Sequence, residues 1–349
     1  MKTRIRGFVL AAGYGTRLRP LTLFLPKPLL PVGPQPVIGH TLRELSRAGC
    51  EAAAVNLHHL PDAVRGVLGE SWHGLPLVYS HEEEIQGTYG ALYPQRDFLR
   101  KADLVVLVNG DTFCRWPLKR LIRRHLASGA DATLLLHRRA PQAALGGGVG
   151  VSDGRVTALR DQTFGEVKRR HIFAGAHILS RHLLERLTAG PGDIISELYM
   201  PLIADGGHVG AVVTRGNWHD LGTAERYLES NLEWTRGRFT RGRLGRRTTS
   251  LSPLAEVHPS ASVQGSVLAA GVRVGANANV ESSVLLANAT VAEGSHIERS
   301  ILGPGVQMPA SAKIDGRMIN RSHIGHQTGP GESMMGDLIY TPLALEADA

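Results

Sequence analysis

Apolar residues recur at a fixed period of 17 over the last third of the chain. Four sets of positions share this period: Val257, Val274, Val291 and Met308; Val263, Val280, Ile297 and Ile314; Val267, Val284 and Ile301; and Leu268, Leu285 and Leu302. Between these positions apolar residues return about every six residues, with Gly, Ala, Asn and Ser at the corners. Such a period predicts stacked units, each a triangular coil of roughly three short strands.

The segment 255–314 resembles a hexapeptide-repeat left-handed parallel β-helix of about three and a half coils. The resemblance implies a role in assembly, and a homo-oligomer formed through the β-helix is expected. His258 and His296 keep open a bifunctional enzyme whose β-helix acylates. After Ile314 the repeat fades, and residues 315–349 are predicted to be either a cap containing Asp337–Tyr340 or a partly disordered tail.

Ahead of the repeat, short apolar runs alternate with helix-patterned segments. Strands are predicted at Phe8–Ala11, Ala53–Leu57, Leu75–Tyr79, Leu104–Val108, Ala132–Leu136, His171–Leu179 and Val209–Val213, and helices at 37–48, 117–128 and 223–234. This rhythm is typical of strand–helix–strand units and predicts an α/β domain with a Rossmann-like, mainly parallel sheet. We expect a catalytic domain over residues 1–236 and a basic linker over 237–254.

The first predicted strand ends in small residues and the turn Gly13-Tyr-Gly15. Because glycine permits a tight turn and a close approach, backbone N–H groups can converge there on an anion. Arg17 and Lys27 add two cations, as a triphosphate and its pyrophosphate leaving group require. The start of the chain therefore predicts a phosphate cradle.

The formal net charge of the 349 residues is +8, which is compatible with nucleic-acid binding. Much of the excess, however, lies at the predicted phosphate cradle and in the Gly/Arg run at 236–247. A polyanionic small substrate and a solvated linker account for both, so neither a nucleic-acid nor a membrane partner is predicted. No run approaches the ~20 apolar residues of a membrane span, and Cys50 and Cys114 are expected to stay unpaired in a cytoplasmic protein.

Taken whole, the segment from Ala12 to Val32 resembles the signature of sugar-1-phosphate nucleotidyltransferases, the NDP-sugar pyrophosphorylases. The resemblance implies that Arg17 holds the β- and γ-phosphates of the nucleotide and that Lys27 holds the α-phosphate region. It assigns the nucleotide to Leu10, Ala11, Ala12, Gly13, Gly15 and Thr16.

Two aspartates are the candidate metal ligands. Asp111 follows a predicted buried strand and Asn109, at the edge where open α/β sheets bind ligands. Asp220 lies in Trp218-His-Asp-Leu-Gly-Thr223, which resembles a second family motif. The resemblance implies that both aspartates bind Mg²⁺ and that Asn109 contacts the nucleotide. The alternatives are a turn cap at Asp111 and a helix cap at Asp220.

The segment from Glu82 to Leu92 bears on the choice of base. Its Gly87-Thr88-Tyr-Gly-Ala-Leu resembles a loop of mannose-1-phosphate guanylyltransferases, where the backbone passes the base and ribose. Glu82 could accept hydrogen bonds from the N1–H and amine of guanine, or belong to a solvated charge run. Gln86 replaces the usual leucine and would suit a pyrimidine, so UTP or dTTP stays an alternative to GTP.

The predicted sugar side departs from the family pattern. Glu166-Val-Lys168 lacks the usual Glu-Lys-Pro, and Phe173-Ala-Gly175 lacks the usual asparagine. Lys168 is predicted to replace the missing lysine from a shifted register, with an exposed loop lysine as the alternative. The predicted contacts to the sugar phosphate are Gly148, Glu166, Lys168 and Gly175.

Together these features predict Mg²⁺-dependent transfer of a nucleotidyl group from an NTP to a sugar 1-phosphate, with GTP and mannose 1-phosphate favoured. Another base, or another sugar such as a heptose 1-phosphate, is the first alternative. A catalytically weakened regulatory subunit that binds an NDP-sugar is the second, because the Glu-Lys-Pro and Asn-Ala-Gly patterns are incomplete.

Overall fold

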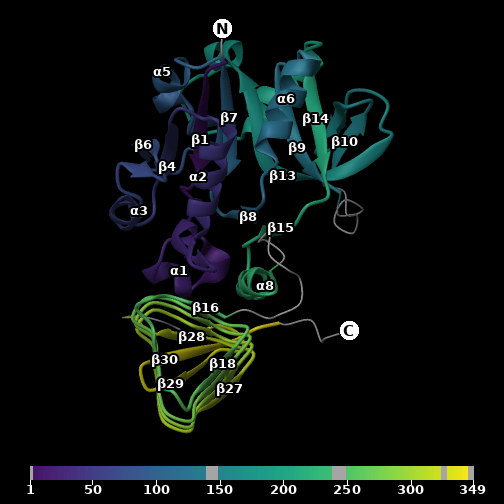
Figure 1. Cartoon of the computed structure of the whole chain (residues 1–349). Coiled ribbons are helices and arrows are strands. Elements are labelled where there is room, and N and C mark those ends of the chain that lie inside the picture. The colour runs from purple at the N-terminus through teal and green to yellow at the C-terminus, as the bar shows by residue number, and fades with distance from the viewer. Residues whose placement is uncertain (1–2, 139–147, 238–248, 324–327, 345–349) are drawn as a thin grey trace. The chain divides into compact units, whose positions relative to one another are not determined.

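The computed structural model describes residues 3–138, 148–237, 249–323 and 328–344 (Figure 1). The chain divides into two compact units, one formed by Met1–Tyr14 and Val37–Trp218 and the other by Gly15–Pro36 and His219–Ala349. The positions of these units relative to one another are not determined, so each is described by itself. Most of the predicted linker lies outside the described residues.

The first unit is built on an 11-stranded sheet with the order β10-β11-β14-β9-β13-β7-β1-β4-β6-β5, to which β12 adds beside β11. The long strands are β1 (Ile5–Leu10), β4 (Ala53–Leu57), β6 (Leu75–His81), β7 (Leu104–Asn109), β9 (Ala132–His137), β13 (Arg169–Ser180) and β14 (Val209–Thr214). The short strands are β5 (Ser71–Trp72), β10 (Val149–Ser152), β11 (Arg155–Leu159) and β12 (Gln162–Thr163). Each of the seven predicted strands is present, with ends that differ from the prediction by a few residues at most.

The half of the sheet that contains β7, β1, β4 and β6 is parallel, as the strand–helix rhythm predicts. β13 departs from that rhythm, because it runs antiparallel to both β7 and β9 (Figure 1). β9 and β14 are again parallel to each other. The start of β13 consequently lies at the same edge of the sheet as the carboxyl ends of β7, β9 and β14.

Helices and turns connect these strands. They are α2 (Val37–Ala48), α3 (Pro61–Leu68), α4 (Gly87–Gly90), η3 (Tyr93–Gln95), α5 (Arg96–Leu99), α6 (Leu118–Ser128), η5 (Arg181–Arg186), the π-turn η6 (Ile195–Tyr199) and α7 (Met200–Ala204). The short strand β8 (Thr112–Cys114) lies between β7 and α6. α2 has its predicted bounds, since Ile38, Leu42 and Leu45 recur on one buried face. α6 begins one residue after its predicted start, and Pro117 is its N-cap.

One face of the sheet packs into a large apolar core. Phe8 of β1, Leu107 of β7, Leu134 of β9 and Tyr199 of the π-turn belong to this core, and each is fully buried. Residues between β13 and β14 and residues between β6 and β7, such as Leu198 and Leu92, contribute to the same core. The sheet is therefore held as a rigid base for the loops that follow its strands.

The second unit begins with the short elements η1 (Thr16–Leu18), α1 (Leu21–Phe24), η2 (Lys27–Leu29), β2 (Pro31–Val32) and β3 (Gln35–Pro36), and includes β15 (Trp218–Asp220) in part and α8 (Ala224–Thr235). Thr223 is the N-cap of α8, and its side chain accepts from the N–H of Arg226. Asn231 of α8 accepts from the Gly33 N–H at 3.0 Å and donates to the Pro31 carbonyl at 3.2 Å. α8 thus fixes the segment that follows Lys27.

The repeat forms three stacked parallel sheets, and Figure 1 shows them as the sides of a triangular coil. Their strands are β16 (Ser250–Leu251), β19 (Val267–Leu268), β22 (Val284–Leu285), β25 (Ile301–Leu302) and β28 (Arg317–Arg321); β17 (Glu256–Val257), β20 (Arg273–Val274), β23 (Thr290–Val291) and β26 (Gln307–Met308); and β18 (Ser262–Gln264), β21 (Asn279–Glu281), β24 (His296–Glu298) and β27 (Lys313–Asp315). Val263 pairs with Val280, Val280 with Ile297 and Ile297 with Ile314, which confirms the period of 17. The first strand begins at Ser250, within the predicted linker.

A column of buried serines follows the same period and was not anticipated from the apolar pattern. Ser266, Ser283 and Ser300 are fully buried. The hydroxyl of Ser266 donates to Gln264 and accepts from the N–H of Ser283, whose hydroxyl in turn accepts from the N–H of Ser300. Each hydroxyl therefore donates one hydrogen bond within its own coil and accepts one from the backbone of the next coil, which offsets the cost of burying it.

The last coil is covered by antiparallel strands. β30 (Leu338–Pro342) pairs with β28, with Ile319 opposite Tyr340, and β29 (Ser333–Met335) pairs with β30. Leu338–Tyr340, part of the predicted cap, lies in β30, while residues 324–327 and 345–349 of this segment lie outside the described residues. None of the helices in the described ranges combines the length and apolar character that a membrane span needs.

Candidate active site

The predicted site residues fall into two groups, one in each compact unit. The first unit holds Leu10, Ala11, Ala12, Gly13, Glu82, Gly87, Thr88, Asn109, Asp111, Gly148, Glu166, Lys168 and Gly175. The second holds Gly15, Thr16, Arg17, Lys27 and Asp220. The geometry of each group is given separately.

The loop after β1 leaves backbone donors available for a ligand. The N–H of Ala11 donates to Asn56 Oδ1 at 2.7 Å, whereas no hydrogen bond to a described residue is recorded for the N–H groups of Ala12 and Gly13. Gly13 is exposed, and a Cβ added there would meet no atom within 4 Å. The open space beside Gly13 is compatible with the predicted phosphate cradle.

Glu82 lies in a buried hydrogen-bond network that sequence reasoning did not find. Its side chain is 4% exposed. Glu82 Oε1 accepts from Asn56 Nδ2 at 2.8 Å, and Glu82 Oε2 accepts from the N–H of Gln86 at 2.9 Å. This overturns the solvated-run alternative. A guanine N–H would have to share a carboxylate oxygen that already accepts a protein donor.

The Asn56 side chain connects two loops through this network. It accepts from Ala11, at the start of the predicted phosphate loop, and donates to Glu82, which holds the loop at Gln86. Asn56 is 3% exposed at the end of an apolar strand. A single asparagine near the end of an otherwise apolar strand is the sequence signal that could have revealed this role.

The glycine loop after Gln86 packs against a later segment of the chain. A Cβ at Gly87 would lie 2.4 Å from the carbonyl oxygen of Gly192, and Gly87 has a φ of +73°. The hydroxyl of Thr88 accepts from the N–H of Ile194 at 2.8 Å. Close packing against residues 190–194 therefore explains both Gly87 and Thr88 within the protein itself.

The carboxyl end of β7 carries Asn109 and Asp111. A Cβ added at Gly175 of β13 would lie 2.9 Å from Asn109 Nδ2, and Gly175 has a φ of +90°. Gly175 therefore makes room for the Asn109 side chain. Beside it, the indole N–H of Trp218 donates to the carbonyl of Ala174 at 2.8 Å, which fixes the bulged part of β13.

In the second unit, three residues that were selected from two separate motifs come together. Lys27 is 6% exposed, and its Nζ lies 4.0 Å from Asp220 Oδ1. A Cβ added at Gly222 would lie 3.0 Å from Arg17 Nη1 and 3.0 Å from Asp220 Oδ2. Arg17 and Asp220 thus border the same glycine, and Lys27 lies near the other oxygen of Asp220.

Arg226 completes this cluster, and sequence reasoning missed it. Its Nη1 lies 3.2 Å from Asp220 Oδ2. Lys27 thus lies near one carboxylate oxygen of Asp220 and Arg226 near the other. No motif marks Arg226, because it reaches Asp220 only through the turn that begins α8.

Of the predicted sugar-phosphate residues, Glu166 and Lys168 are exposed, whereas Gly148 and Gly175 are buried. Lys168 Nζ lies 2.7 Å from Asp153 Oδ2 and 3.8 Å from Glu166 Oε2. The hydrogen bond and charge of Lys168 lower the pKa of Asp153. Gly148, by contrast, accepts from Arg170 through its carbonyl at 3.0 Å. The Lys168 ammonium is therefore paired with surface carboxylates of its own region.

Protein side chains alone do not form a metal centre in the described residues. No cluster of three or more His, Cys, Asp or Glu side chains that could hold a metal occurs within the described parts of the chain. Cys50 and Cys114 are unpaired and buried, and burial raises the pKa of the Cys50 thiol to about 12. Both thiols are thus poor nucleophiles.

Comparisons with curated proteins place these residues in a family context. The chain is 32% identical over 230 residues to a mannose-1-phosphate guanyltransferase of Pichia angusta, covering 64% of this chain and 62% of that protein. It is 30% identical over 296 residues to a mannose-1-phosphate guanylyltransferase of Mycobacterium tuberculosis, covering 78% of this chain and 82% of that protein. The chain thus spans less than two thirds of the Pichia angusta relative.

A solved structure shares the fold. A crystal structure from Bacillus anthracis, titled a "Putative Glucose-1-Phosphate Thymidylyltransferase" in complex with sucrose, superimposes with a TM-score of 0.57 at 22% identity. The matched region covers 70% of this chain and 98% of the Bacillus anthracis chain.

The family descriptions divide the chain where its sequence texture changes. Residues 238–321 match the GlmU-like C-terminal hexapeptide family, in agreement with the 17-residue coils. Residues 6–237 match the nucleotidyl transferase family, and that match includes the loop after β1, Asp111 and Asp220. This chain belongs to the nucleotidyl transferase family.

Proposed function

We propose that this protein transfers a guanylyl group from GTP to a sugar 1-phosphate, with mannose 1-phosphate as the preferred acceptor. The observation that carries the proposal is the cluster of Arg17, Lys27 and Asp220, in which the carboxylate of one motif lies beside two cations of another. The names of the curated relatives support the choice of GTP and mannose 1-phosphate.

The reaction needs charge neutralisation more than proton transfer. The phosphate of the sugar is an anionic nucleophile, so its oxygen forms a bond to the α-phosphorus of GTP without a general base. The bond from the α-phosphorus to the bridging oxygen breaks, and pyrophosphate leaves with the electron pair. Arg17 would hold the β- and γ-phosphates and the departing pyrophosphate, while Lys27 would neutralise the α-phosphate region.

The carboxylates fit a magnesium ion. Asp220 lies between Lys27 and Arg226, and Asp111 follows β7 at the edge of the sheet. Oxygen donors of this kind suit Mg²⁺, and we propose that both aspartates hold it. When bound, the ion supplies positive charge to the reacting phosphates.

The donors of the loop after β1 would receive the nucleotide phosphates. Ala12 and Gly13 offer backbone N–H groups without partners among the described residues. The bond from Ala11 to Asn56 fixes the start of this loop, and the Glu82 network fixes the loop at Gln86. Glu82 would then act on the base by positioning that loop.

Assembly and location complete the proposal. Leu254 is 70% exposed on the β-helix and Met335 is 70% exposed on its cap, apolar surface that a second copy could cover. We therefore propose a homo-oligomer formed through this region. The two unpaired cysteines suit a reducing cytoplasm.

A matrix of four NTPs against a panel of sugar 1-phosphates, assayed by pyrophosphate release, tests this function. The expected result is the highest kcat/KM for GTP with mannose 1-phosphate, and a fall of at least about a hundredfold in Asp111→Asn and Asp220→Asn. Asp97→Asn, at an exposed aspartate, is the matched control. A preference for UTP or dTTP would reject guanylyl transfer, and no turnover with any pair would favour the regulatory subunit.

A further inference from the structure

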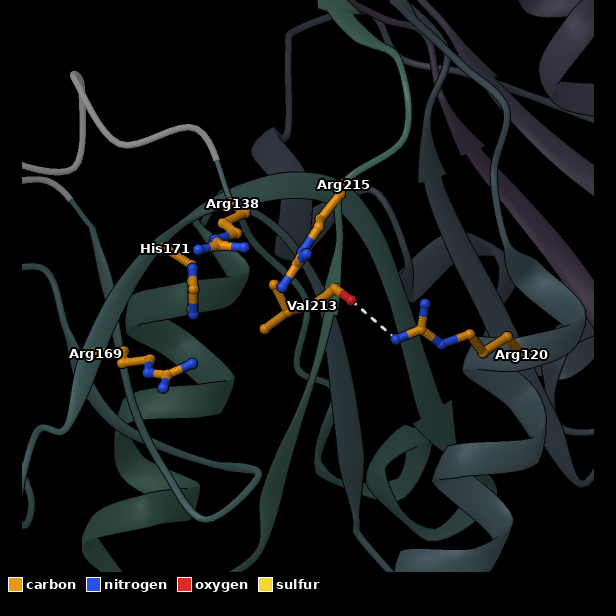
Figure 2. A pocket seen from close by; sticks show the side chains of 6 residues that line it. All are labelled: Arg120, Arg138, Arg169, His171, Val213 and Arg215. Carbon is orange, nitrogen blue, oxygen red and sulfur yellow. Dashed lines mark hydrogen bonds between the residues drawn. The ribbon is translucent and has the colours of Figure 1, made fainter.

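The first unit contains a strongly basic pocket that the proposed reaction does not use. The pocket has a volume of about 500 Å³. It is lined by Arg120, Arg138, Arg169, His171, Val213 and Arg215. Figure 2 shows the side chains of Arg138, Arg169 and Arg215 on one side with His171, and Arg120 on the other side of Val213. The lining contains four arginines and no carboxylate.

The direction of β13 brings these residues to one place. Arg138 follows the end of β9 and Arg215 follows the end of β14, two strands that pair in parallel up to their last residues. Arg169 and His171 lie two residues apart at the start of β13, so their side chains share a face. Because β13 is antiparallel to β9, its start meets those two strand ends. A parallel β13 would place Arg169 and His171 at the opposite edge.

One arginine is fixed by the backbone, and the other three form no ion pair with any residue that the structure describes. Arg120 Nη2, from α6, donates to the carbonyl of Val213 at 2.9 Å, as the dashed line in Figure 2 marks. Within the described ranges, no ion pair is recorded for Arg138, Arg169 or Arg215. Like charges gathered in a pocket repel one another, which costs folding free energy unless an anion neutralises them.

His171 reports the same uncompensated charge. Its side chain is 8% exposed, and its Nδ1 is buried with no hydrogen-bond partner among the described residues. Burial lowers the pKa of His171, and the charges of Arg169 and Arg138 lower it further. Arg215, just after β14, and Arg120 of α6 line the same pocket, so every charged group that lines it is positive. Buried polar atoms without partners are unusual and often mark functional sites.

We propose that this pocket binds a small molecule through a phosphate group. Guanidinium groups present paired N–H donors that match phosphate oxygens, and several of them around one cavity suit a dianion better than a single carboxylate. The volume lies within the range of sites for small molecules. The inference does not depend on guanylyl transfer, because binding can be measured without turnover.

Two sources could supply this phosphate. One is a second phosphate on the sugar substrate, remote from the anomeric phosphate that reacts. The other is a free phosphorylated metabolite that binds without being consumed. The pocket lies at the edge of the sheet that also carries Asn109 and Asp111, at the ends of different strands, so the geometry is compatible with either source.

Isothermal titration of the full chain with inorganic phosphate, glucose 6-phosphate and glucose tests the binding. We expect glucose 6-phosphate to bind the wild type and to bind the double variant Arg138→Gln/Arg169→Gln about tenfold to a hundredfold more weakly. Arg124→Gln, an exposed arginine on α6 outside the pocket, is the matched control and should bind like the wild type. Neutral glucose should show no difference among the three proteins.

A charge-retaining variant separates lost binding from lost folding. Arg138→Lys/Arg169→Lys keeps both positive charges and should recover part of the affinity, while thermal melting compares the stability of all variants. Equal affinity for glucose 6-phosphate in the wild type and the glutamine double variant would overturn the proposal. So would failure of the wild type to bind either phosphate probe at millimolar concentration.

Steady-state kinetics distinguish the two sources. If the phosphate belongs to the substrate, mannose 1,6-bisphosphate should have a higher kcat/KM than mannose 1-phosphate, and this ratio should fall towards one in the glutamine double variant. If the phosphate is free, glucose 6-phosphate should change the rate with mannose 1-phosphate in the wild type and in Arg124→Gln but not in the double variant. Either result supports an anion site in this pocket, and failure of the transferase reaction itself leaves the titration valid.

Discussion

The buried histidine of β13 makes stability depend on pH in a calculable way. His177 is 1% exposed, its Nδ1 lies 2.7 Å from the hydroxyl of Tyr199, and its ring packs edge-on against Phe173. Burial lowers the pKa of His177 to about 3. The imidazole is therefore neutral in the folded protein at any pH where the protein would normally be studied.

In the unfolded chain the same imidazole has a pKa near 6.5, so the unfolded state binds the proton first as the pH falls. Above pH 6.5 His177 is neutral in both states, and the free energy of unfolding is not reduced by its protonation. As the pH falls from 6.5 towards 3, protonation of the unfolded state lowers the free energy of unfolding progressively. At pH 5 the loss amounts to about 2 kcal/mol. His125, whose pKa burial lowers to about 4, adds about the same loss at that pH.

Urea unfolding at pH 7.5 and pH 5, followed by circular dichroism, measures this effect. We expect the free energy of unfolding of His177→Gln to fall by about 2 kcal/mol less than that of the wild type between these pH values. His258→Gln, at an exposed histidine of the β-helix, controls for removal of one imidazole. Parallel pH dependence in His177→Gln and the wild type would refute the reasoning, as would an NMR titration of His177 with a midpoint near 6.5.

Three further variants test other parts of the structure. Gly87→Ala should cost about 1–3 kcal/mol in thermal melting, because its Cβ would lie 2.4 Å from the Gly192 carbonyl oxygen. Gly129→Ala, also at positive φ but with no atom within 4 Å of the new Cβ, should cost less. Equal losses in the two variants would contradict the packing argument. Ser283→Ala should cost about 1–3 kcal/mol because it leaves the N–H of the next coil without an acceptor, and unchanged urea unfolding of the β-helix would reject that role. Arg17→Ala should raise the KM for the NTP far more than the KM for the sugar phosphate in pyrophosphate-release assays, and the reverse pattern would contradict its assignment.

Local patterns in the sequence determined a large part of the fold. α2 and β4 have the bounds predicted from their own residues, since an apolar face and a flanking glycine act over one element. The pairing of Val263 with Val280 and of Val280 with Ile297 follows from the period alone, because every coil stacks on a copy of itself. The nucleotidyl transferase family was likewise evident from contiguous motifs.

Tertiary structure alone decided how the separate motifs meet. The antiparallel direction of β13 gathers the arginines of the pocket, and the turn before α8 brings Arg226 to Asp220. The burial of Glu82 between Asn56 and Gln86 is likewise invisible in its acidic run. Strand direction and side-chain pairing between distant segments depend on packing over the whole sheet, which the local spacing of residues does not encode.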